Sequence, residues 1–379
     1  HGTDIAVILG LTGYDPTTID TTQIPFIIEQ ITREELLTLP SGDPLVFRPA
    51  REIQDLKKFL SAHPSALKFT ARIQDRQTIS STYYSIGGGF IQKEREPSAL
   101  STYHFPFPIN TESDLLGWIR ETGLTMAEIV WKNECSIRPE AQVREGLREI
   151  WDHMQSAIFR GCQSDGILPG GLEVRRRAAP MQRKLLGEAA VFEHQEAWIK
   201  AIKSSGNSFS VINQWVSCFA LAVNEENAAF GRVVTAPTNG AAGVIPAVLM
   251  YYLCFCDQKS NDDVKLFLLI AGEIGSLYKK GSTISAAMGG CQAEIGVSSS
   301  MAAAGLTACQ GGTCEQILMA AEIAMEHHLG LTCDPIKGLV QIPCIERNTM
   351  GAIKAITASQ LALSGDHTFS KVKLDTIIK

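Results

Sequence analysis

The sequence has little that would fit a secreted, membrane-bound or nucleic-acid-binding protein. Its longest apolar run, residues 240–256, is interrupted by Pro246 and is too short to cross a bilayer comfortably, so we expect a buried helix there. No charged segment followed by an apolar one marks a signal peptide. The densest basic run is residues 175–177, and the formal net charge is −6. We therefore expect neither nucleic acid nor membrane as a partner.

Cysteine is also scarce. The 379 residues include 10 cysteines, too few and too scattered for the dense disulfide framework of a small secreted domain. Several, such as Cys218 and Cys309, lie inside apolar helical stretches. This pattern indicates a reducing cytoplasm, where thiols stay free or bind metal.

Repeats and an initial methionine are absent as well. No internal repeat or low-complexity tract is visible, and the length predicts two or three domains with a core large enough for a buried site. The chain begins at His1, and the residues after it already have the pattern of structured chain. We therefore expect that an N-terminal segment is missing.

The first hundred residues contain short elements. Apolar segments at residues 5–9, 45–48, 67–73 and 78–86 predict strands and short helices of a mixed domain, with turns at residues 40–42 and 87–89. Alternating prolines at residues 105–108 indicate a connector, because proline suits neither a helix interior nor a central strand. The first domain is therefore assigned to residues 1–108.

After Thr111 the pattern is helical almost throughout. Apolar residues from Val143 to Ile158 share one helical face, with Pro139 near the start and Gly161 at the stop. A capping box at Thr313 predicts a helix through residue 325 that Gly330 would end. Further helices are expected at residues 213–230, 245–256, 264–278 and 344–363.

The fold prediction is α+β. A small mixed α/β domain is followed by an all-helical domain at residues 109–379, and several of its helices are apolar on most sides. This apolar surface exceeds what one bundle needs, so a homodimer is expected.

The residues that point to chemistry are Cys291, Cys333 and Cys344. The first follows two glycines, the second precedes Asp-Pro and the third follows a proline, so each is flanked by turn formers. Thiols on loops can converge on one ion or cluster. Their spacings do not match zinc knuckles. From spacing alone, one shared metal site and three unrelated buried thiols both remain open.

The longer motifs around these residues are more specific, and they cover nearly the whole chain. The motifs are EHHLGLTCDP (326–335), VQIPCIERN (340–348), GGCQAEIG (289–296), AVNEENAA (222–229), VTAPTNGA (234–241) and TYYSIGGGF (82–90). Together they resemble the single-chain bacterial iron–sulfur L-serine dehydratases (L-serine ammonia-lyases).

The resemblance implies a lyase of amino-acid degradation and gluconeogenesis that converts L-serine to pyruvate and ammonia. In this family three cysteines hold a [4Fe–4S] cluster and leave one iron open to substrate. Carried over, Cys291, Cys333 and Cys344 are those ligands. The open iron would act as a Lewis acid on the serine hydroxyl while a base removes the Cα proton.

The same motifs supply candidates for binding the substrate. Thr238, Asn239 and Gly240 suit a carboxylate, and a helix cap after Pro237 is the alternative reading. Lys279 and Ser285 precede the first cysteine and are expected to meet substrate charge, although either alone could be a surface residue.

His1 is the candidate base. It heads a His-Gly-Thr-Asp element that resembles the family's histidine motif near the active site, and a disordered terminus is the alternative. His327 and His328 lie near a predicted helix end, where a structural role is favoured.

The chain also departs from the family. A Ser-Ser-Ser-His stretch that precedes the first domain is absent, and so is the C-terminal tail whose cysteine can occupy the open iron. We expect both segments to be missing from this sequence. The first domain resembles the family's small allosteric substrate-binding domain, so regulation by serine is expected.

Other classes of protein fit the sequence less well. An L-cysteine desulfidase on a related cluster scaffold is the alternative, and the first domain and the Cys333 motif favour serine. A scaffold with a structural metal would need a fourth obvious ligand. Residues 204–207 suggest the loop of a pyridoxal-phosphate dehydratase, but the lysine context is missing and a loop between helices is expected. Residues 83–90 lack the Gly-Lys-Ser/Thr ending of a phosphate loop.

Overall fold

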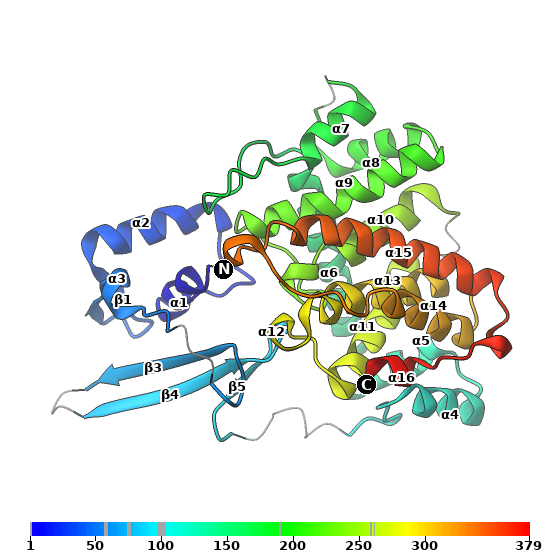
Figure 1. Cartoon of the computed structure of the whole chain (residues 1–379), viewed down its shortest axis with the longest axis horizontal. Coiled ribbons are helices and arrows are strands. Elements are labelled where there is room, and N and C mark those ends of the chain that lie inside the picture. The colour runs from blue at the N-terminus through cyan, green and yellow to red at the C-terminus, as the bar shows by residue number, and fades with distance from the viewer. Residues whose placement is uncertain are drawn as a thin grey trace.

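The computed structural model describes residues 2–56, 60–73, 77–96, 104–188, 191–257, 260 and 262–379. Figure 1 shows a body of packed helices, with a smaller part at one side that contains the strands. The strands all lie before residue 94 in the described chain, and helices follow from residue 112 onward. The α+β prediction is therefore confirmed. The exact boundary between two domains at residue 108 stays a prediction.

The first part of the chain has a small core of its own. Helices α1 (Thr3–Leu11) and α2 (Ile24–Glu34) pack with the hairpin of β1 (Leu36–Thr38) and β2 (Pro44–Val46), followed by the short α3 (Pro49–Glu52). Its buried residues are Ile8, Ile31, Leu37 and Phe47. The predicted turn at residues 40–42 joins β1 to β2.

A second sheet extends outward from this region. Strands β3 (Ala66–Arg72), β4 (Thr78–Ser85) and β5 (Ile91–Lys93) are antiparallel, with Leu67 opposite Tyr83 and Ser85 opposite Ile91. The turn between β4 and β5 contains three glycines whose φ angles are 93°, 60° and 78°. Only glycine adopts this left-handed region without a Cβ penalty, so the predicted turn at residues 87–89 is confirmed.

The helical part begins with three helices, of which α4 and α5 open on capping boxes. Thirteen α-helices and four 3₁₀ turns are assigned in the described residues of this part. The α-helices are α4 (Glu112–Thr122), α5 (Met126–Ile137), α6 (Glu140–Gly161), α7 (Ala178–Leu186), α8 (Gln195–Ser204), α9 (Phe209–Ala228), α10 (Val244–Phe255), α11 (Asp263–Gly281), α12 (Ala286–Gly289), α13 (Ile295–Cys309), α14 (Cys314–Glu326), α15 (Cys344–Ser364) and α16 (Leu374–Ile378). The 3₁₀ turns are η4 (Asn239–Ala241), η5 (Gly290–Ala293), η6 (Ile336–Gly338) and η7 (His367–Phe369).

Helix α13 lies at the centre of the core. Every residue from Ile295 to Cys309 is buried, and α10, α11, α14 and α15 pack around it. Its serines donate to backbone carbonyls, for example Ser298 Oγ to Ala236 O at 2.7 Å and Ser299 Oγ to Gly351 O at 2.8 Å. Buried hydroxyls that keep a partner avoid the cost of desolvation. A helix buried on all sides is a fixed support for the residues just before it.

The predicted helices agree with the structure. Helix α6 and the four helices expected at residues 213–363 are present, and the capping box of α14 is complete. Helix α14, predicted through residue 325, ends at Glu326, and the turn after it leads to Gly330. His327 and His328 bond through Nδ1 to the carbonyls of Ile323 and Ala324, at 2.8 and 2.7 Å, and so satisfy the acceptors of the last turn.

The structure also bears on membrane insertion. Within the described residues, no helix combines the length and the apolar character that a membrane span requires. The loop predicted at residues 204–207 lies between α8 and α9 from residue 205 onward, since α8 ends at Ser204 and α9 begins at Phe209.

Candidate active site

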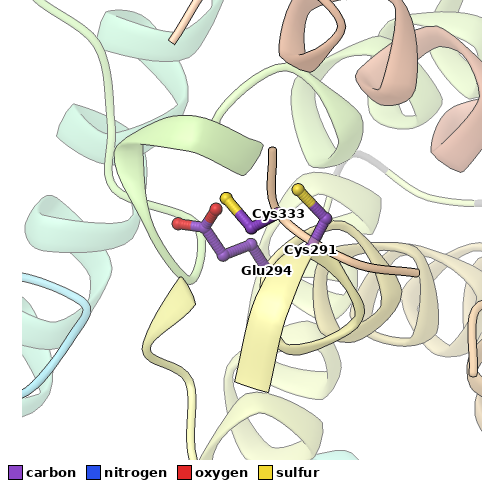
Figure 2. Close-up of side chains that lie close together, drawn as sticks. All are labelled: Cys291, Glu294 and Cys333. Carbon is purple, nitrogen blue, oxygen red and sulfur yellow. The ribbon is translucent and has the colours of Figure 1, made fainter. Parts of the chain in front are cut away.

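Three cysteines from separate segments meet beside the central helix. Cys291 lies in η5, just before α13, Cys333 lies in the loop after α14, and Cys344 is the first residue of α15. The ligand atoms of Cys291, Cys333 and Glu294 all lie within 4.8 Å of one another (Figure 2). Cys344 stands outside this group of three, but its thiol hydrogen-bonds with that of Cys291. All ten cysteines of the chain are free.

Close backbone approach brings the loops of Cys291 and Cys333 together. Gly290 has a φ of 71°, and a Cβ on it would lie 3.0 Å from the carbonyl oxygen of Leu331. The Gln292 N–H donates to Leu331 O at 3.0 Å, and its side-chain oxygen accepts from the Gly330 N–H at 2.8 Å. A glycine before Cys291 is therefore required by both the backbone angle and the available space.

Arg347 lies directly against this group. Its Nη1 lies 3.1 Å from Cys291 Sγ and also donates to Thr332 O at 2.8 Å, while Nη2 bonds to Asp334 at 3.1 Å. One guanidinium thus contacts Cys291 and both neighbours of Cys333. A cation at this position favours the thiolate form of Cys291.

Asn348 connects the third cysteine to the segment that follows Pro237. Its Nδ2 donates to Cys344 O at 2.9 Å and to Gly240 O at 2.7 Å, and its Oδ1 accepts from the Gly243 N–H at 3.1 Å. Asn348 is fully buried. Its amide therefore fixes the start of α15 relative to η4.

The three thiols differ in pKa. Hydrogen bonding with Cys344, and then with Arg347, lowers the pKa of Cys291 to about 6. Cys333 is an exposed residue, but partial burial of its thiol, and then the charge of Cys291, raises its pKa to about 12. The hydrogen bond to Cys291, and then burial, raises the pKa of Cys344. The first thiolate therefore forms at Cys291. Cys333 and Cys344 lose their protons readily only if a cation binds between the thiols.

Glu294 is the carboxyl group next to the thiols. Burial raises its pKa to about 7, opposed by the nearby Thr238 hydroxyl and assisted by the charge of Cys291. A Cβ on Gly240 would lie 3.0 Å from Glu294 Oε2, so Gly240 also adjoins the carboxyl group. The structure therefore brings the predicted residues Thr238 and Gly240 beside the cysteines.

Thr238 and Asn239 differ in their side-chain hydrogen bonds. Asn239 Oδ1 accepts from Thr235 Oγ1 at 2.7 Å. Thr238 occupies the N-cap position of η4, but its side chain makes no capping hydrogen bond. The predicted cap is therefore correct for the position of Thr238, but its buried hydroxyl has no hydrogen-bond partner among the described residues.

Lys279 and Ser285 have partners away from the thiols. Lys279 Nζ lies 2.7 Å from the centroid of the Phe90 ring, and burial lowers the pKa of Lys279 to about 8. Ser285 is buried at the N-cap of α12, and its N–H donates to Thr283 Oγ1 at 3.1 Å. Within the described chain, no hydrogen bond or ion pair links either residue to the cysteines.

The candidate base, His1, lies outside the described residues. The next residue, Gly2, packs near Phe230, since a Cβ on Gly2 would lie 2.6 Å from Phe230 Cε1. The start of the chain is thus held against the segment that follows α9.

Sequence reasoning missed Glu294, Arg347, Asn348 and Phe90. All four lie inside motifs that supported the resemblance, so their positions were noticed but no role was assigned. For Glu294, Arg347 and Asn348 the available signal was a charged or amide side chain within four residues of a cysteine, whereas Phe90 had no such signal.

Comparison with known proteins gives consistent matches over both parts of the chain. Residues 121–379 match the family model described as "Serine dehydratase alpha chain", and residues 1–96 match "Serine dehydratase beta chain". The chain is 44% identical over 385 residues to the L-serine dehydratase of Streptomyces coelicolor, covering 100% of this chain and 81% of that protein. It is 43% identical over 382 residues to L-serine dehydratase 1 of Escherichia coli, with the same coverage. It is 44% identical over 383 residues to the L-serine dehydratase of Haemophilus influenzae, again covering 81% of the relative.

Proposed function

Because this chain belongs to the serine dehydratase family, with the regions of its alpha and beta chains in one polypeptide, we propose that it is an L-serine dehydratase. It converts L-serine to pyruvate and ammonia, uses a [4Fe–4S] cluster and needs no pyridoxal phosphate. The observation that carries this proposal is the convergence of three free thiols from distant segments beside a carboxyl group.

The donor set fits an iron–sulfur cluster. Such clusters are held by cysteine thiolates, and Cys291, Cys333 and Cys344 offer three, assisted by Arg347 at Cys291. Cys291 and Cys344 are buried, whereas Cys333 is exposed. Three ligands rather than four also agree with a site that must admit substrate. When bound, a cluster of this kind supplies a Lewis acid that makes hydroxide a better leaving group.

The residues around the thiols have proposed roles in holding the substrate. Thr238 and Asn239 offer a hydroxyl and an amide, and Gly240 allows close backbone approach to a carboxylate. Lys279 and Ser285 add a cation and a hydroxyl for the charged ends of serine. Electrostatic pairing with the substrate carboxylate would orient Cα for proton removal.

Two proton transfers are required. We assign the removal of the Cα proton to His1, from the family resemblance. Glu294, placed within 4.8 Å of the sulfur atoms of Cys291 and Cys333, is the carboxyl group positioned to give a proton to the departing hydroxyl. Loss of water from serine gives aminoacrylate, which tautomerises to an imine. Addition of one water to the imine then releases ammonia and pyruvate.

The proposal also covers location, oligomeric state and domain organisation. We propose a cytoplasmic homodimer whose residues 1–108 form a regulatory domain and whose residues 109–379 form the catalytic domain. The apolar surfaces left on the first domain support dimerisation, since Val46 is 65% exposed and Ile91 is 71% exposed.

The decisive experiment is anaerobic reconstitution with iron and sulfide, followed by an assay of pyruvate from L-serine without pyridoxal phosphate. We expect a brown chromophore with about four irons per chain. Both the chromophore and the pyruvate should be lost in Cys333→Ala and kept in Cys254→Ala, a half-buried thiol elsewhere. A colourless active protein, or activity that requires pyridoxal phosphate, would contradict the proposal. Sulfide release from cysteine without pyruvate from serine would identify a desulfidase instead.

A further inference from the structure

The turn between β4 and β5 reaches from the first part of the chain onto the helical part. A Cβ on Gly87 would lie 2.9 Å from Ile284 O, and one on Gly88 would lie 2.8 Å from Pro237 O. These distances are shorter than real Cβ contacts, so glycine is required for the turn to sit this close. Figure 1 shows this end of the sheet beside α12. The turn is thus packed against two segments at once.

Both of these segments carry proposed substrate residues. Pro237 directly precedes Thr238, and Ile284 directly precedes Ser285. Both Ile284 and Ser285 are buried, so the segment has little freedom to move on its own. A displacement of the turn would therefore be transmitted to the residue next to each contact.

The last residue of the turn, Phe90, contacts a further proposed substrate residue, Lys279 on α11. Lys279 Nζ lies over the face of the Phe90 ring, 2.7 Å from its centroid. In the part of the chain that the structure describes, no carboxylate lies within ion-pair distance of Lys279. The aromatic face is attractive to a cation and leaves its charge uncompensated, so the ammonium can still bind an anion.

We propose that Phe90 is a positioning residue for the substrate site, which holds the Lys279 ammonium beside the segments of Thr238 and Ser285. The first domain thereby sets how tightly the carboxylate of the substrate binds. This inference rests on the proposed function, specifically on the assignment of Lys279 to the substrate carboxylate. Burial also keeps the pKa of Lys279 at about 8, which agrees with an ammonium covered by the ring.

The first test is a kinetic cycle on the reconstituted full chain with Phe90→Leu, Phe90→Tyr, Lys279→Gln and the double variant Phe90→Leu/Lys279→Gln. We expect Phe90→Leu to raise KM for L-serine about 5- to 10-fold with kcat within about twofold, and Phe90→Tyr to restore KM. In the Lys279→Gln background, Phe90→Leu should have no further effect, because the cation that it positions is gone. If Phe90→Leu raised KM by the same factor in the parent and in the Lys279→Gln background, the positioning role would be overturned.

A second measurement does not depend on activity. The pKa of Lys279 can be followed by NMR after ¹³C-methylation of lysines, with Lys279→Arg to assign the signal. Phe90→Leu should raise this pKa from about 8 toward the ordinary lysine value, because the ammonium loses its cover. An unchanged pKa would overturn the contact itself. If Lys279→Gln leaves KM unchanged while the pKa shifts as expected, the contact stands and the proposed role of Lys279 fails.

The glycines of the turn provide a matched pair. Gly88 and Gly89 both have positive φ, but a Cβ on Gly89 would meet nothing within 4 Å. Alanine at either position has a similar backbone cost. The two variants therefore differ in the contact with Pro237, and only Gly88→Ala displaces the turn from it. We expect Gly88→Ala to raise KM as Phe90→Leu does, and Gly89→Ala to leave it within about twofold. The same KM in both variants would contradict the inference.

Discussion

Arg347 donates from one nitrogen, Nη1, both to Cys291 Sγ at 3.1 Å and to the carbonyl oxygen of Thr332 at 2.8 Å. Thr332 directly precedes Cys333, so a single guanidinium connects the segments of two of the three cysteines. The other nitrogen, Nη2, bonds to Asp334 on the far side of Cys333. Arginine is suited to this task because its donors have a fixed planar arrangement, which a lysine ammonium lacks.

Replacing Arg347 should change the reactivity of Cys291 in the protein without a cluster. In Arg347→Gln we expect the pKa of Cys291 to rise, since a charge-assisted hydrogen bond to its thiolate is lost. The pH dependence of alkylation by iodoacetamide, with the labelled cysteine identified by mass spectrometry, measures this directly. Arg148→Gln is the control, because Arg148 forms exposed ion pairs on α6. An identical labelling profile in Arg347→Gln and the parent chain would show that Arg347 does not act on the thiol.

Substitution of Glu294 should separate chemistry from cluster binding. Glu294→Gln keeps the shape of the side chain but removes its acidic proton. We therefore expect kcat to fall by about 10²-fold while the iron content stays the same. Glu346→Gln is a matched control near Cys344, since Glu346 pairs with Arg177 and is well exposed. Loss of iron in Glu294→Gln would instead identify Glu294 as a ligand.

The affinity for serine should fall in alkaline solution. The pKa of Lys279 is lowered to about 8, and only the protonated form attracts a carboxylate. KM should therefore be constant below about pH 7 and rise through pH 8, reaching about tenfold by pH 9 if the neutral amine does not bind. Lys279→Arg, which stays charged, should show a flat profile over the same range. A parent KM that does not change between pH 7 and pH 9 would remove Lys279 from the substrate site.

Glu273 should make the fold less stable as the pH rises through the weakly acidic range. Burial raises its pKa to about 7, with Lys280 Nζ 4.0 Å away as a partial counter-charge. The folded state therefore keeps its proton up to about pH 7, whereas the unfolded chain releases it near pH 4.5. By linkage, stability is lost between these values, up to about 3 kcal/mol. Glu273→Gln should match the parent at pH 4.5 and unfold at a higher temperature at pH 8.

Two glycines of α6 should respond in opposite ways to alanine. A Cβ on Gly161 would overlap the backbone of Ala222 in α9, whereas one on Gly146 would meet nothing within 4 Å. We expect Gly161→Ala to destabilise the protein by about 2–4 kcal/mol through forced separation of α6 and α9. Gly146→Ala should stabilise it by about 0.5–1 kcal/mol through helix propensity. Urea denaturation of both variants measures the difference, and equal midpoints would contradict the packing.

Much of the fold could be predicted because local signals agreed with the final packing. The apolar face of α6 and the capping box at Thr313 are determined by residues within a few positions of each other. Helix α13 was not predicted as a separate element, since it is buried on every side and has no polar face to define a period. The end of α14 was predicted to within one residue, but no spacing rule anticipates that the two histidines after it bond to its last carbonyls.

The site was only partly predictable for a related reason. The cysteines stand out because turn residues flank them, but their partners depend on tertiary approach. Gly240 adjoins Glu294 across 54 positions of the chain, and Phe90, in the part of the chain with the strands, contacts Lys279 in α11. Such pairs follow no periodic pattern in the sequence, so their contact can be recognised only in the folded structure.

The order of the cysteines along the chain has a consequence for biosynthesis. Cys291 and Cys333 are 42 residues apart, with α13 and α14 between them, and Cys344 begins α15. A chain still emerging from the ribosome therefore cannot present all three thiols until nearly the whole helical part has been made. Insertion of the proposed cluster would therefore follow the folding of this framework, in which Cys333 is the exposed one of the three cysteines.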